Sequence, residues 1–129
     1  MPSFADIEAI YVKLIGYMPG RMKDRVKRGH RIDPEFTNML EKLREHAVAP
    51  KALDLKTSQL IAFGILLNNL SHAAVNHGCA ALRAGATEED LHAVAEMAFL
   101  FRGLPAINFA EEAIAGALEA YAKQKITLP

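Results

Sequence analysis

The sequence contains no tryptophan and one cysteine, and its charges cancel. A single cysteine, Cys79, excludes both an intramolecular disulfide and a Cys-x-x-Cys redox pair. Fifteen basic and fifteen acidic residues leave no net field to attract nucleic acid or a membrane surface. The longest apolar run, Leu60 to Leu67, is far too short for a membrane span. Residues 1–20 show no signal peptide, so we expect a cytoplasmic protein.

Motifs for common bound groups are also missing. There is no P-loop, dinucleotide fingerprint, zinc-ligand spacing or Gly-x-Ser-x-Gly sequence. Glu89 and His92 have the spacing that di-iron bundles use, but such bundles need two of these motifs and only one is present. We therefore predict no metal and no cofactor. The basic run Arg21 to Arg31 lacks interleaved aromatic residues, which favours a solvated surface over a nucleic-acid site. It could still attract anionic substrates.

Strand patterns are absent, whereas helical patterns recur throughout the 129 residues. The length fits one domain, residues 1–129, and we predict an all-α, single-domain helical bundle. Caps and breaks predict helices with these approximate bounds: Ser3 to Tyr17, Asp33 to Ala49, Asp54 to Leu67, Ser71 to Gly85, Thr87 to Arg102, and Pro105 to Tyr121. Residues 122–129 resemble a fraying tail.

The strongest candidate for chemistry is His77. On a helix its neighbours in angle are all apolar and most are small: Leu70, Ala73, Ala74, Ala80, Ala81 and Ala84. Desolvation in such surroundings disfavours imidazolium and keeps a neutral base available near pH 7. The alternative is a purely structural histidine, buried and hydrogen-bonded to a backbone carbonyl.

The apolar content exceeds what a small monomer needs. The helix at Leu60–Leu67 is apolar all round, and Val75, Cys79 and Leu82 give the His77 helix a second apolar stripe. These surfaces predict that subunits pack together.

Three segments carry a family resemblance: Leu53–Ala62 followed by His77, then Ala81–Leu91, then Gly103–Asn108. Over about residues 33–120 the chain resembles the carboxymuconolactone decarboxylase family, which includes the alkylhydroperoxidase D-like proteins. The resemblance implies an all-helical fold and homotrimers or hexamers with sites close to subunit contacts.

The chain departs from that family at several positions. The peroxidase branch has a Cys-x-x-Cys motif ahead of the histidine, where this chain has Leu70 and Ala73, so peroxidase activity is disfavoured. Gln59 stands where members often have glutamate, and its spacing to His77 is one residue shorter than usual.

The resemblance implies cofactor-free decarboxylation or enolisation of a small carboxylated lactone or keto acid. In this hypothesis His77 moves the proton, while Gln59, Arg102 and Asn108 stabilise the enolate. His72 could bind a substrate carboxylate. Simpler interpretations stay open, because Arg102 could extend to the surface, Asn108 could cap a helix and His72 could lie on a solvated edge. A non-catalytic ligand-binding or assembly role is the alternative for the whole protein.

Overall fold

The computed structural model describes residues 2–127, and in that range all regular structure is helical. The predicted all-α fold is therefore confirmed. The helices are α1 (Phe4–Ile15), α2 (Gly20–Ile32), α3 (Pro34–Val48), α4 (Leu55–Asn68), α5 (Ala73–Arg83), α6 (Glu88–Arg102) and α7 (Leu104–Thr127). None of the helices in the described range combines the length and the apolar character that a membrane span needs.

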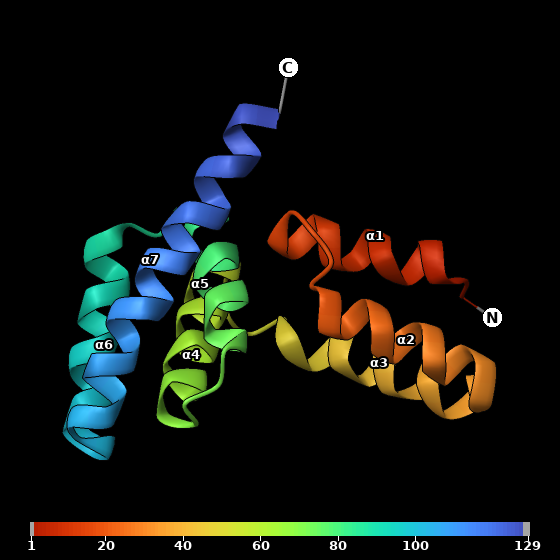
Figure 1. Ribbon diagram of the computed structural model, residues 1–129, viewed down its shortest axis with the longest axis horizontal. Helices are drawn as coiled ribbons and strands as arrows, with labels where there is room; N and C mark the ends of the chain where they lie inside the picture. Colours follow the sequence, from red (N-terminus) through yellow and green to blue (C-terminus); the bar gives the residue numbers. More distant parts are fainter. Residues whose placement is uncertain (1, 128–129) are drawn as a thin grey trace.

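The helices form two groups that meet at α5 (Figure 1). Helices α4, α5, α6 and α7 pack into a bundle, with α5 between α4 and α7. Helices α1, α2 and α3 form a second group on one side of this bundle, and α1 packs against α5. The segment 49–54 connects the groups, so the ends of α3 and α4 lie near their junction.

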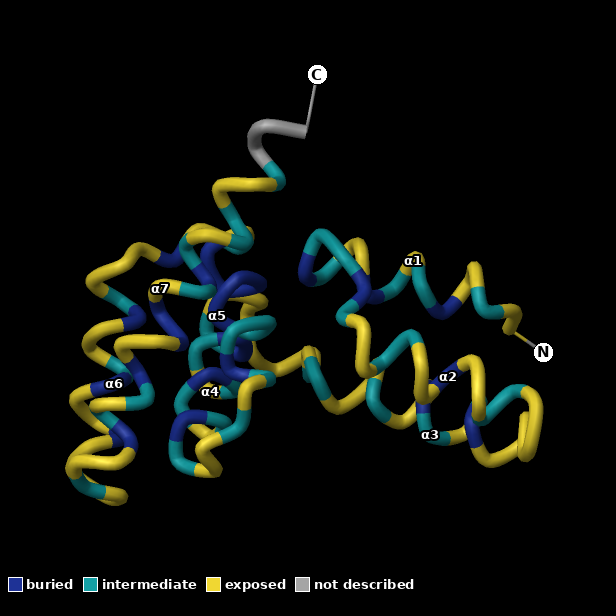
Figure 2. The backbone as a smooth tube through the Cα atoms, in the orientation of Figure 1, coloured by how far each residue is buried: buried dark blue, intermediate teal, exposed yellow. Residues whose placement is uncertain are grey.

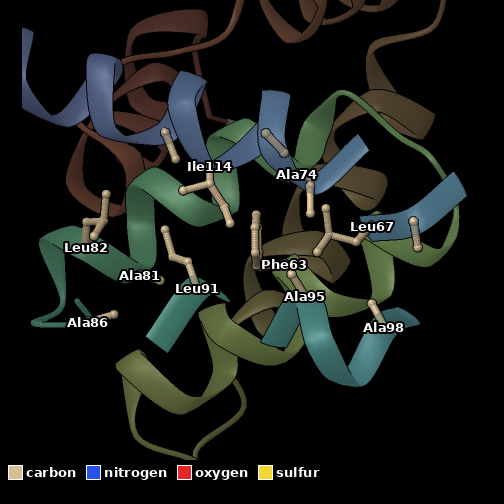
Figure 3. Close-up of a cluster of buried hydrophobic side chains, with 14 residues drawn as sticks. Phe63, Leu67, Ala74, Ala81, Leu82, Ala86, Leu91, Ala95, Ala98 and Ile114 are labelled. Carbon is tan, nitrogen blue, oxygen red and sulfur yellow. The ribbon is translucent and has the colours of Figure 1, made fainter. Parts of the chain in front are cut away.

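The bundle core is built largely of alanine, around a few large side chains from α4, α6 and α7 (Figure 3). Phe63, Leu67 and Leu91 are completely buried there. Small residues allow the helices to approach closely. At Gly78 an added Cβ would lie 2.9 Å from the Cβ of Ala117, so only hydrogen fits between α5 and α7 at this point.

Hydrogen-bonded caps confirm the predicted helix starts. The Ser3 and Thr87 hydroxyls each accept a hydrogen bond from the backbone of the residue three positions later, in reciprocal capping boxes. Asp33 and Asp54 cap α3 and α4 in the same way with their carboxylates. The predicted break before the His77 helix is also present, and Leu70 adopts a left-handed conformation there (φ 51°).

One local expectation is wrong. The basic run Arg21 to Arg31 lies on the largely exposed helix α2, which agrees with a solvated surface, whereas residues 122–127 continue α7 instead of fraying; residues 128–129 of the predicted tail lie outside the described range. Gln124 explains this difference. Its amide donates to the Ile15 carbonyl (2.9 Å), and its oxygen accepts from Arg83 (2.7 Å). These contacts tie the last turns of α7 to α1 and α5.

Of the apolar surfaces predicted on α4 and α5, one is buried within the chain and the other is partly exposed. The Cys79 side of α5 is covered by Ile7, Tyr11 and Ile15 of α1, so this chain buries it without a second subunit. On α4, by contrast, Ile61 and Ile65 remain 48% and 57% exposed. Figure 2 shows exposed residues along the outer sides of α6 and of the α2–α3 pair, and buried residues along α5.

Candidate functional site

The structure brings His77 and Gln59 together. His77 lies in the middle of α5 and Gln59 in the second turn of α4, and Nδ1 of the ring lies 2.8 Å from Oε1 of the amide. Gln59 is completely buried, whereas His77 is half-buried. The pair combines a fixed amide with an imidazole that is not fully enclosed.

The surroundings of Gln59 determine which ring nitrogen carries the proton. Its Nε2 donates to the Val48 carbonyl (2.9 Å) and to the Ser58 hydroxyl (3.2 Å). Val48 is the last residue of α3, so its carbonyl has no partner within the helix. With both amide hydrogens used, Oε1 must face His77 and accept from Nδ1–H. Nε2 is then the unprotonated nitrogen, and no hydrogen-bond partner for it occurs in the described part of the chain.

The electrostatic environment keeps this imidazole neutral. Burial disfavours the charged ring, and the positive charge of Arg44 adds to the effect, so that the pKa of His77 falls to about 4. At pH 7 the ring is therefore a neutral base with its lone pair on Nε2. A neutral, oriented imidazole can accept a proton from carbon and return it readily.

Arg44 is a functional candidate that sequence reasoning missed. It lies on α3, one turn before Val48, and its guanidinium carbon stands 4.2 Å from the centre of the Tyr11 ring. In the sequence it is one charged residue in the run Lys42 to Glu45, which a helical pattern assigns to a solvated face. Its contact with Tyr11 of α1 and its place one turn before Val48 identify it, and no local motif does.

Three other predicted site residues make no hydrogen bond or ion pair to the His77–Gln59 pair. Within the described residues Arg102 is exposed at the end of α6 without an ion pair, and Asn108 is exposed in the first turns of α7. His72 is exposed just before α5, and its ring makes an edge contact with Phe109 (centroids 5.5 Å apart). Their predicted contacts with substrate stay predictions.

The polar stripe that continues from His72 along α5 is used for tertiary contacts. Asn76 accepts a hydrogen bond from the Tyr17 hydroxyl (2.8 Å), and Arg83 donates to Gln124. Cys79 is also structural. Its thiol is buried and donates to the Ile15 carbonyl (3.4 Å), and burial raises its pKa, so the reactive thiolate is disfavoured.

Five clefts lie elsewhere on the described surface, and neither His77 nor Gln59 lines these five. One is an apolar groove of about 320 Å³ between α4 and α6. Among the residues the structure describes, no three His, Cys, Asp or Glu side chains gather as they would around a metal ion. The candidate site is thus one oriented, neutral imidazole in the field of the Arg44 charge.

NMR of ¹⁵N-labelled histidine should reveal this arrangement directly. We expect His77 to be the Nδ1–H tautomer, with a pKa of about 4, so that its basic form is lost only as the pH falls towards that value. Gln59→Met removes the acceptor while keeping an unbranched side chain, and the ring should then populate both tautomers. A single Nδ1–H tautomer in the Gln59→Met protein would show that Gln59 does not orient the base.

Comparisons with known proteins agree with this architecture. A model of the carboxymuconolactone decarboxylase family matches residues 34–116. The crystal structure of a provisionally named carboxymuconolactone decarboxylase from Burkholderia xenovorans LB400 superimposes with a TM-score of 0.76, at 21% identity, over 98% of this chain and 100% of that chain. At this identity the likeness shows a shared fold alone. None of the curated proteins matches the chain. Because the family model spans more than half of the sequence, the chain belongs to the carboxymuconolactone decarboxylase family.

Proposed function

We propose that the protein catalyses cofactor-free decarboxylation or enolisation of a small carboxylated lactone or keto acid, with His77 as the proton-transfer group. One observation carries this proposal: Gln59 holds the imidazole so that Nε2 is unprotonated and has no hydrogen-bond partner among the described residues. That nitrogen is left to accept a proton. Membership of the family supports the class of substrate.

The chemistry needs one proton acceptor and a place for an electron pair. In enolisation, Nε2 of His77 takes a proton from the carbon next to the carbonyl, and the C–H electron pair forms the enolate. The imidazolium then returns the proton at a second carbon. In decarboxylation, the C–C bond to the carboxylate breaks, carbon dioxide leaves, and a proton passed from water through Nε2 quenches the enolate. Because its pKa is low, the protonated ring gives up its proton easily.

Gln59 acts on the ring of His77 in this mechanism. The sequence suggested direct donation from its amide to the enolate, but Val48 and Ser58 occupy both amide hydrogens. Gln59 is accordingly a positioning residue, and Arg102 and Asn108 remain proposed donors that would have to reach the substrate once it is bound.

A small panel of γ-lactone carboxylates and β-keto acids tests the proposal. Release of carbon dioxide reports decarboxylation, and exchange of the α-proton for deuterium, followed by NMR, reports enolisation. We expect at least one compound to respond in one of the two assays. A panel that shows neither reaction contradicts the catalytic proposal.

The second candidate is a non-catalytic ligand-binding or assembly protein. It is favoured by the absence of His77 from the five clefts and by the extent of exposed apolar surface in the described chain. Saturable binding of a panel compound without carbon dioxide release or deuterium exchange would support this alternative.

We further propose that the chain assembles as a homotrimer or a hexamer. Support comes from large apolar side chains that the chain leaves exposed on α4, α6 and the start of α7: Ile61, Ile65, Met97, Leu100, Phe101 and Leu104. Ile61, Ile65, Met97 and Phe101 line one apolar groove, and exposed apolar surface of this kind is typical of a protein–protein interface.

The double substitution Leu100→Glu/Phe101→Glu should dissociate such an assembly, because it would bury two uncompensated charges at each contact. Light scattering coupled to size-exclusion chromatography measures the mass, and the exposed polar pair Glu111→Gln/Glu112→Gln on α7 is the control. A wild-type chain that elutes as a monomer at high concentration contradicts the assembly proposal.

A further inference from the structure

We infer that Arg44 binds a carboxylate group of the substrate next to His77. The inference rests on the proposed function and specifies its substrate as an anion recognised by a guanidinium on α3. No motif in the sequence indicates this residue, and the structure indicates it through its place on α3, its stacking on Tyr11 and its lack of an ion pair among the described residues.

The first step is position. The Val48 carbonyl at the end of α3 holds the Gln59 amide, which in turn holds the His77 ring. Arg44 lies four residues before Val48 and therefore on the same side of α3, which faces the junction with the bundle. Its charge acts on the imidazole, since Arg44 contributes to the lowered pKa of His77.

The second step is orientation. The Arg44 guanidinium stacks over the ring of Tyr11, which is completely buried and whose hydroxyl donates to Glu41 (3.0 Å). Stacking on an immobile aromatic ring limits the freedom of the arginine side chain. The guanidinium is thus held in place before any ligand arrives.

The third step is that the positive charge of Arg44 is not paired with a carboxylate. Glu41 is the nearby buried carboxylate, but it is paired with Arg25, which also donates to the Tyr11 hydroxyl. Arg44 forms no ion pair and donates no hydrogen bond among the residues that the structure describes. A stacked guanidinium whose donors are unused is suited to bidentate binding of a carboxylate.

A bound carboxylate would also change the basicity of His77. Its negative charge offsets the field of Arg44, so the pKa of His77 should rise when the site is occupied. The ring then becomes a stronger proton acceptor in the complex than in the free protein. The charge of the substrate thus controls the basicity of His77 through Arg44.

Malonate is a suitable probe because it carries carboxylates without a lactone or a ketone, and malonamide is its uncharged counterpart. We expect calorimetry to show saturable malonate binding that Arg44→Gln weakens at least tenfold. The malonate affinity of Arg44→Lys should lie between those of the wild type and Arg44→Gln, because lysine keeps the positive charge but lacks the bidentate geometry of the guanidinium. Arg31→Gln, on the exposed side of α2, is the matched control and should bind like wild type. Unfolding midpoints confirm that each variant is folded.

Several results would overturn the inference: no malonate binding by the wild type, equal binding of malonamide, unchanged affinity in Arg44→Gln, or a loss caused instead by Arg102→Gln. A second readout is the His77 pKa, which should rise on saturation with malonate in the wild type and stay constant in Arg44→Gln. Carboxylate binding that depends on Arg44 without turnover of any panel compound would contradict the proposed reaction alone. Turnover with an unchanged KM in Arg44→Gln would contradict the role of Arg44 alone.

Discussion

Substitution of His77 by glutamine is expected to abolish turnover and to leave the protein folded. Glutamine has no group that takes up a proton near neutral pH, so the loss of general base catalysis should lower kcat at least 100-fold. The fold should survive because the new amide can donate to Oε1 of Gln59, as Nδ1–H does now. The cavity left behind is small, since the ring is partly accessible.

The measurement is the initial rate on the substrate found in the panel, together with the thermal unfolding midpoint. His92→Gln is the matched control, because His92 is exposed on α6, where it pairs with Glu96. It should retain the wild-type rate. If His77→Gln also retains that rate, His77 is a structural histidine and the proposed mechanism is wrong.

The largest effect on stability is expected from Phe63→Ala. The Phe63 ring is completely buried at the centre of the bundle, where α5, α6 and α7 surround it (Figure 3). Its edge would lie 3.3 Å from a Cβ added at Gly78, which shows how closely α5 approaches. Removal of the ring leaves a cavity that backbones already in contact cannot close, so we expect a loss of about 3–5 kcal/mol in the free energy of unfolding.

Urea denaturation measures this loss, and Phe101→Ala makes the same chemical change on a side chain that is 79% exposed in the single chain. At protein concentrations at which the proposed assembly is dissociated, so that Phe101 lies on a free surface, that control should cost less than about 0.5 kcal/mol. A loss in Phe63→Ala no larger than this would mean that the core differs from the one described. A large loss in Phe101→Ala alone, dependent on protein concentration, would indicate that another subunit covers α6.

The sequence predicts the elements whose signals are local. Ser3, Asp33, Asp54 and Thr87 each have a short polar side chain directly ahead of a helical pattern, and each caps the helix expected there. The alanine face around His77 likewise predicts a ring among tightly packed helices. These inferences need only the geometry of one helix.

Features that depend on contacts between helices could not be predicted in this way. Arg44 looks like any solvated charge until α3 is placed against Tyr11 of α1, and the last turns of α7 look unstable until Gln124 meets the end of α1. Only the family resemblance indicates Gln59 as a site residue. Its actual contact, a carbonyl at the end of another helix, has no signature in the sequence.

That carbonyl makes the reactivity of His77 sensitive to mechanical displacement. Val48 belongs to the α1–α3 group, whereas His77, Gln59 and Ser58 belong to the bundle, so one of the two hydrogen bonds that fix the Gln59 amide crosses the junction. A displacement of α3 that breaks this bond would leave Ser58 as the sole acceptor from the amide, loosen the amide and let the ring proton migrate to Nε2. A cross-link that clamps α3 to α4 should hold the protein permanently in its proton-accepting state.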